Sequence, residues 1–198
     1  MKAYYEHPLL REWAFLWPPL LFWRQVTLRA VLHHLPADPP HRLLEIGCST
    51  GFLTRKLREK YPHTEIWAVD LSRRAIRRAQ RRHLPGVHFR VADFGYQLPA
   101  NAFPLVVSMN VFQLLPPDPA FQRLRDLLAP GGTALITLTT ETLLTRWHRW
   151  FYRRVARSEV YLDPPEQVIQ RVRALGLAVE FTPIEATEGS YLLTLRRP

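Results

Sequence analysis

Apolar runs of strand length alternate with segments of helical period from residue 43 to about residue 138. Such alternation predicts a parallel sheet whose strands are joined by crossover helices. Two further apolar runs end the chain, and the short link at residues 187–189 predicts that they form an antiparallel hairpin. The expected strands lie at residues 43–46, 66–69, 87–91, 105–107, 134–138, 178–184 and 190–196. The chain is therefore expected to be an α/β protein: a doubly wound, mostly parallel seven-stranded sheet with helices on both faces.

Residues that favour helix ends punctuate the segments between these strands. Ser72 is expected to cap the helix after the second strand. Asp118 and Asp163, each followed by proline, are expected to cap two later helices. The sequence Pro130-Gly131-Gly132 is expected to end the first of these two helices, and Gly176 the second.

Two aromatic-rich segments, residues 1–36 and 141–162, lie outside the alternation. The first is expected to be an N-terminal helical lid; packing against the sheet, or an interfacial helix pair that makes a peripheral membrane contact, are the alternatives. The second is an aromatic and basic insertion containing "TRWHRWFYRR", a composition suited to an anionic amphiphile, a membrane surface or RNA. A chain of 198 residues has room for one substantial core, so residues 1–198 are expected to form a single domain.

The stretch "EIGCSTG" at residues 45–51 fits two kinds of site. G-x-S-x-G is the pattern of a hydrolase nucleophile elbow, and it is also a variant of a glycine-rich cofactor loop. An elbow lies in the middle of a sheet, whereas this loop follows the first predicted strand. A cofactor loop calls for an acidic residue at the end of the second strand, where it can bind both hydroxyls of a ribose, and Asp70 holds that position. Because the loop lacks both G-x-G-x-x-G and the lysine of a P-loop, an adenosine ligand without phosphates is favoured.

Over roughly residues 40–198 the chain resembles the class I S-adenosylmethionine (SAM) dependent methyltransferases. "LLEIGCSTGFL" is similar to the first motif of that family, "WAVDLS" to the second and "VADFGYQLP" to the third. "LVVSMNVFQLLPP" with "LLAPGGTALIT" is similar to the fourth strand and the segment that follows it. The four pieces are specific in combination, because they occur in the family's order at compatible spacings.

The resemblance implies SAM as the cofactor and a loop that holds its methionine and ribose portions. The loop residues implied are Glu45, Gly47, Cys48, Ser49 and Gly51. Two positions depart from the family pattern. Ser49 stands where a glycine is usual, and Pro104 stands where an aspartate is usual. A serine is small enough to be tolerated in such a loop.

Beyond the loop, the resemblance implies contacts with adenosine and with methionine. Asp70 would bind the ribose hydroxyls, and Leu71 would pack on adenine. Asp93 and the backbone amide of Phe94 would read the adenine edge. Met109–Asn110 would lie beside the methionine moiety. No metal is implied.

The implied reaction is an in-line displacement that depends mainly on alignment, so it does not require a dedicated base. None is identified; the residues that qualify by position alone are His148, Tyr4, Tyr5, Tyr152 and Tyr191. The expected acceptor is a small apolar or anionic molecule. The segment "MNVFQLL" is similar to the matching region of trans-aconitate and malonyl-carrier-protein methyltransferases, which makes a carboxylate acceptor a hypothesis.

The chain has 27 basic and 17 acidic residues, a formal charge of +10 that attracts anionic partners. Six arginines in two adjacent rows on the helix after Asp70 suit an acidic carrier protein or a phosphate backbone: Arg73, Arg74, Arg77, Arg78, Arg81 and Arg82. RNA methylation, or a binding protein that has lost catalysis, are the alternative functions. The lone cysteine excludes an intramolecular disulfide, and the longest uncharged aromatic run, residues 13–23, is too short to span a bilayer. A cytoplasmic protein is expected.

Overall fold

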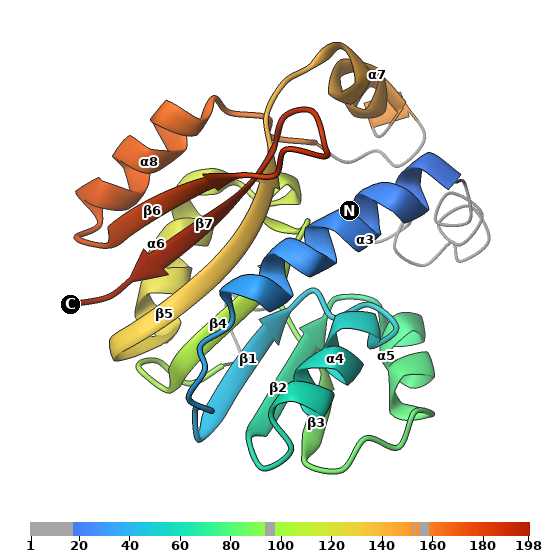
Figure 1. The fold of residues 1–198 in the computed structure, drawn as a ribbon, viewed down its shortest axis with the longest axis vertical. Coiled ribbons are helices and arrows are strands. Elements are labelled where there is room, and N and C mark those ends of the chain that lie inside the picture. The colour runs from blue at the N-terminus through green and yellow to red at the C-terminus, as the bar shows by residue number, and fades with distance from the viewer. Residues whose placement is uncertain (1–17, 94–97, 152, 155–158) are drawn as a thin grey trace.

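The computed structural model describes residues 18–93, 98–151, 153–154 and 159–198 (Figure 1). Its seven strands are β1 (Arg42–Ile46), β2 (Glu65–Asp70), β3 (Val87–Val91), β4 (Phe103–Met109), β5 (Leu128–Thr139), β6 (Ala178–Pro183) and β7 (Ser190–Arg196). Its helices are α3 (Pro18–His34), α4 (Phe52–Lys60), α5 (Arg73–Gln80), the short 3₁₀ helix η1 (Phe112–Leu114), α6 (Pro117–Leu127), α7 (Leu143–Phe151) and α8 (Pro165–Ala174).

The seven strands form one sheet in the order β3-β2-β1-β4-β5-β7-β6. The strands from β3 to β5 are parallel, and β7 runs antiparallel to both β5 and β6. This arrangement confirms the predicted fold and the predicted C-terminal hairpin. Because the strand order reverses at β1, the crevice between the carboxyl ends of β1 and β4 is the place where such sheets bind ligands.

Helices cover both faces of the sheet (Figure 1). On one face, α3 and α4 pack against the central strands, and Ile76 and Ala79 of α5 pack beside them against β2 and β3. On the other face, α6 and α8 pack against β4, β5 and β7. The central strands are buried on both faces, which is why their sequences are nearly continuous apolar runs rather than alternating ones.

Two of the expected helix caps are wrong. The first residues of α6 and α8 are Pro117 and Pro165, and Pro116 and Pro164 hold the cap positions. In each case the second proline of a Pro-Pro pair takes the first helical position, where its missing N–H costs nothing. Asp118 lies inside the first turn of α6, and Asp163 precedes the cap of α8; both carboxylates pair with Arg171 instead.

The fifth strand is longer than predicted. Helix α6 ends at Leu127, so Pro130-Gly131-Gly132 does not end it. The strand begins at Leu128, and Gly131 and Gly132 exchange backbone hydrogen bonds with Arg197. Pairing with the end of the chain therefore draws this turn-like sequence into the sheet.

The two aromatic segments are described only in part. Helix α3, from the front segment, buries Leu28 and Val31 against the sheet and α4, and Leu35 directly after the helix joins the same cluster. Residues 1–17 lie outside the described residues. Helix α7 is the described helix of the 141–162 insertion, and Figure 1 places it beyond the end of β5. No helix within the described ranges has both the length and the apolar character needed to cross a bilayer.

Candidate functional site

The loop after β1 turns back sharply over the end of β2. The backbone N–H groups of Gly47 and Cys48 both donate to the carbonyl oxygen of Val69, at 2.8 and 2.9 Å. Gly47, Ser49 and Gly51 have φ angles of 78°, 50° and 79°, in the left-handed region that favours glycine. The conformation of Ser49 therefore explains why glycine is usual at its position.

Asp70, the last residue of β2, anchors this loop. Its Oδ2 accepts a hydrogen bond from the N–H of Ser49 at 2.9 Å, and its Oδ1 accepts one from the N–H of Ser72 at 2.8 Å. Ser72 in turn caps α5, as predicted, by accepting the N–H of Ala75. The carboxylate is thus held at the carboxyl edge of the sheet, and each of its oxygens retains a lone pair for a further donor.

Glu45 lies in β1 directly below the loop and is only 2% exposed. Its Oε2 has no hydrogen-bond partner within the described part of the chain. Burial raises the pKa of this carboxyl to about 8; the nearby Asp70 adds to the rise, and the Thr54 hydroxyl opposes it. An unpartnered buried carboxyl oxygen at this edge of the sheet is a site for a hydrogen-bond donor.

The expected adenine contacts directly follow the neighbouring strands β2 and β3. Leu71 is 44% exposed, and Val91 on the edge strand β3 is 41% exposed. Asp70 is the register partner of Val91 in the parallel pair of β2 and β3, so Leu71 and Asp93 follow adjacent strands at the same edge. Asp93 is exposed, and Phe94 lies outside the described residues.

The loop after β4 closes against the loop after β1. Asn110 has a φ of 60°, and its conformation is fixed by Thr137 of β5. The Thr137 hydroxyl accepts the Asn110 N–H at 3.0 Å and donates to Asn110 Oδ1 at 3.1 Å. A Cβ on Gly47 would overlap the side chain of Val111, so the two loops touch. Met109 is half-buried at the end of β4.

Of the eleven site residues expected from the sequence, all but Phe94 lie in the described chain. These ten lie at the carboxyl ends of the four adjacent parallel strands β3, β2, β1 and β4. Sequence reasoning missed Thr137 and Val111, which position the β4 loop, and Arg82, whose Nε donates to the carbonyl of Thr50 at 2.6 Å. Arg82 carried no signal beyond its place in a basic helix.

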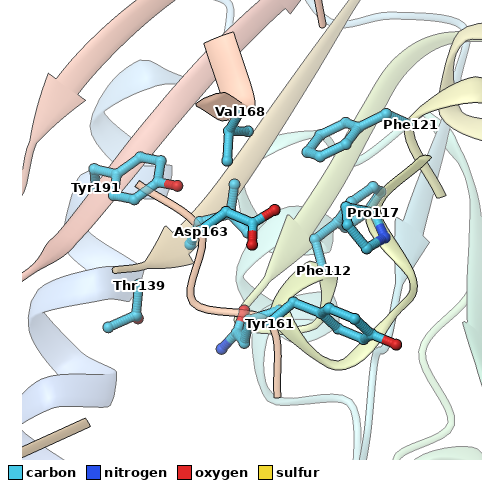
Figure 2. A pocket seen from close by; sticks show the side chains of 10 residues that line it. Phe112, Pro117, Phe121, Thr139, Tyr161, Asp163, Val168 and Tyr191 are labelled. Atoms are coloured by element: carbon cyan, nitrogen blue, oxygen red, sulfur yellow. The ribbon is translucent and has the colours of Figure 1, made fainter. Parts of the chain in front are cut away.

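A small pocket lies next to this edge, between η1, the end of β5 and the start of β7 (Figure 2). Its wall is mostly aromatic and aliphatic, and the enclosed space has room for about one water molecule. Two buried atoms of its lining residues, Gln113 Oε1 and Thr139 Oγ1, have no hydrogen-bond partner among the residues described. The one charged lining residue is Asp163, whose carboxylate pairs with Arg171 at 2.9 Å.

Of the candidate bases, Tyr191 has a described side chain, and it lines this pocket. Burial raises the pKa of its phenol, with Asp163 and Glu166 nearby adding to the rise. The hydroxyl therefore stays protonated at neutral pH and acts as a hydrogen-bond donor rather than a base. His148 lies in α7, and Tyr4, Tyr5 and Tyr152 lie outside the described residues.

Comparison with known proteins gives one matching family model, described as a methyltransferase domain, over residues 43–132. A trans-aconitate 2-methyltransferase of Rhodopseudomonas palustris is 33% identical over 111 residues, covering 56% of this chain and 43% of that protein. A malonyl-[acyl-carrier protein] O-methyltransferase of Bacillus cytotoxicus is 32% identical over 133 residues, covering 66% of this chain and 46% of that protein. The chain thus spans about half the length of the curated relatives it matches.

Solved structures share the fold. An S-adenosylmethionine-dependent methyltransferase of Mesorhizobium loti superposes with a TM-score of 0.73 at 18% identity, covering 87% of this chain and 98% of that chain. At that identity the likeness concerns the fold.

Proposed function

We propose that the chain is a class I SAM-dependent methyltransferase that transfers a methyl group from SAM to a small acceptor, as its match to a methyltransferase domain and its methyltransferase relatives support. The observation that carries the proposal is the position of Asp70. A carboxylate fixed by two backbone N–H groups at the end of β2 suits the two hydroxyls of a ribose. SAM supplies a methyl carbon bonded to a positively charged sulfur.

The residues present fit this cofactor. The left-handed backbone at Gly47 and Gly51 lets the loop bend sharply over the sheet edge, where a Cβ at either position would meet neighbouring side chains of the protein. Glu45 offers a buried unpartnered oxygen, which suits a ligand that carries an ammonium group. Leu71 offers an exposed apolar surface of the kind on which an adenine ring packs. The Asp70 carboxylate, at the loop of a chain with net charge +10, favours a cationic ligand at this place.

The contribution of the chain to the reaction is alignment. Asp70 would hold the ribose, the Gly47–Gly51 loop would lie beneath the ligand, and the Thr137–Asn110 hydrogen bonds would fix the loop that faces the reacting carbon. Positioning of this kind corresponds to effective molarities of roughly 10⁵–10⁸ M in well-oriented systems. No proton transfer by a side chain is required when the acceptor is already a carboxylate.

Two acceptor classes are supported by different observations. The names of the two relatives above favour a carboxylate. An uncharged apolar acceptor is the second class, because the two segments that the sequence offers as covers for this edge, residues 1–36 and 141–162, are rich in aromatic residues. Both classes lie within the proposal of a small apolar or anionic acceptor.

Calorimetric titration with SAM and with S-adenosylhomocysteine (SAH) tests the cofactor, and transfer of labelled methyl from SAM tests the acceptor. Matched pairs such as benzoate with phenol, and hexanoate with hexanol, separate the two acceptor classes. We expect both cofactor forms to bind and one member of each pair to be methylated. Failure of SAM and SAH to bind would refute the proposal; binding without transfer to any acceptor would leave a binding protein with a methyltransferase fold.

A further inference from the structure

Helix α5 and strand β3 form the most one-sidedly charged region of the chain. Residues 71–92 contain seven arginines and no aspartate or glutamate. Six of the seven form what is here called the arginine face: Arg73, Arg74, Arg77, Arg78, Arg81 and Arg82. The seventh, Arg90, is exposed on β3, which is an edge strand.

The packing of α5 turns the arginine face outward. The helix buries Ala75, Ile76 and Ala79 against β2 and β3. The arginines are spaced in two neighbouring rows, within each of which consecutive residues are four positions apart. Four of them lie on α5 itself, whereas Arg81 and Arg82 follow its last residue and Arg82 reaches back to Thr50. Four helical residues rise about 6 Å, so each row presents charges at a regular spacing of that size. Every member of the arginine face is exposed except Arg78, which is half-buried.

This arrangement is unfavourable for the isolated helix. Like charges four residues apart repel each other on a helix, and two arginines in the first turn oppose the positive end of the helix dipole. Four of these side chains, Arg73, Arg74, Arg77 and Arg81, form no ion pair with any acid in the described chain. A bound polyanion would remove the repulsion.

The chemistry of the face distinguishes among polyanions. Protein interfaces and membrane-binding helices rely on apolar or aromatic anchors beside their charges. No large apolar side chain is exposed on α5 among the residues described, and the nearest exposed ones, Leu71 and Val91, lie at the proposed cofactor site. Guanidinium groups without such anchors suit the phosphodiester backbone, which their planar donors bind in pairs.

We propose that the arginine face of α5 binds the phosphate backbone of a nucleic acid. Contacts to phosphates alone carry no sequence information, so the binding is independent of sequence and RNA and DNA strands bind alike. The proposal does not make nucleic acid the methyl acceptor. Because its test needs neither SAM nor methyl transfer, its failure is distinct from failure of the proposed function.

The experiment measures fluorescence anisotropy of labelled 20-nucleotide oligo(U) and oligo(dT) with the full chain at 50–300 mM NaCl. The logarithm of the affinity is expected to fall linearly with the logarithm of salt concentration. About five neutralised phosphates on a single strand give a slope of about −3.5. The test variant is Arg74→Gln/Arg77→Gln/Arg81→Gln, which spares Arg82 because that side chain holds the cofactor loop.

The matched control is Arg29→Gln/Arg173→Gln/Arg196→Gln, which removes the same number of charges from exposed arginines on α3, α8 and β7. The test variant should bind at least ten-fold more weakly at 100 mM salt, with a slope shallower by about 2. Its thermal midpoint should not fall, since repulsion within α5 is relieved. The control should lose less than three-fold in affinity.

Three outcomes would overturn the proposal. Equal losses in both variants would mean that net charge alone attracts the strand. Displacement of the strand by poly-L-glutamate at equal charge concentration would assign the face to an acidic protein. Binding to vesicles containing phosphatidylserine, with no binding of either strand, would assign it to a lipid surface.

Discussion

Replacement of Glu45 by glutamine should change how the stability of the protein depends on pH. Glu45 is fully buried at the end of the first strand, and burial raises its pKa to about 8 from an ordinary value near 4.5. Between these two values the native protein keeps a proton on Glu45 that the unfolded chain releases. The free energy of unfolding therefore falls as pH rises through this window.

The size of the effect follows from the width of the window. Each pH unit within it lowers the free energy of unfolding by about 1.4 kcal/mol. From pH 5.5 to pH 7.5 the wild-type protein should thus lose roughly 3 kcal/mol through this one carboxyl. Such a loss is a large part of the total stability of a typical domain, about 5–15 kcal/mol. Glutamine has nearly the same shape and does not ionise, so Glu45→Gln should lack this contribution.

The assay is urea unfolding followed by tryptophan fluorescence at pH 5, 6, 7 and 8, without cofactor. Other titrating groups contribute to both proteins, so the informative quantity is the difference between Glu45→Gln and wild type at each pH. That difference should be small at pH 5 and should grow in favour of the variant up to pH 8. Glu180→Gln, at an exposed position on β6, controls for loss of a carboxylate. A difference that stays constant from pH 5 to pH 8 would refute the reasoning, because it would mean that Glu45 is ionised throughout.

Three further substitutions test contacts between residues distant in the sequence, two at the site and one at the amino ends of β2 and β3. Gly47→Ala should lower the free energy of unfolding by about 1–2 kcal/mol because of the φ of 78° alone, and the overlap of the new Cβ with Val111 should add to that loss. Adding Val111→Ala should relieve the overlap, so the double variant should lose less than the sum of the two single losses. Additive losses in urea unfolding would contradict the contact between residues 47 and 111. Arg58→Met removes the donors to four backbone carbonyls, those of Tyr61, Pro62, Thr64 and Gly86. The free energy of unfolding should fall by about 2–4 kcal/mol as a result. A loss below about 1 kcal/mol would mean that this buried guanidinium is dispensable. Arg82→Met should weaken SAH binding about five-fold with little change in thermal midpoint. The reason is the loss of one hydrogen bond, worth about 1 kcal/mol, from Arg82 to the Thr50 carbonyl in the cofactor loop. Unchanged affinity for SAH would mean that Arg82 has no role in the loop.

The strands and the general position of the site were predictable because they depend on local patterns. The parallel strands are buried on both faces, so their apolar runs stand out in the sequence, and Asp70 is recognisable because it ends one of them. The cap at Ser72 was predictable for the same reason: a serine forms its capping bond within three residues of itself.

The features that sequence reasoning missed depend on contacts between distant residues. Asp118 and Asp163 looked like helix caps, but both pair with Arg171 on α8, a charge that no local pattern connects to them. Likewise Arg58 resembles a surface residue of α4, yet its guanidinium reaches Gly86, 28 positions along the chain. The early start of β5 depends on pairing with Arg197 at the end of the chain.

The most direct test of the account is the affinity for SAH of wild type, Asp70→Ala, Asp70→Asn and the exposed control Asp38→Ala, measured by calorimetry. Both Asp70 variants should lose the charged hydrogen bonds to the ribose, which lowers the binding free energy by about 2–3 kcal/mol. Such a loss corresponds to roughly 30- to 150-fold weaker binding of SAH. Native circular dichroism should be retained by all four proteins, and Asp38→Ala should bind as the wild type does. Equal affinity of wild type and the folded Asp70 variants would contradict the proposed cofactor site.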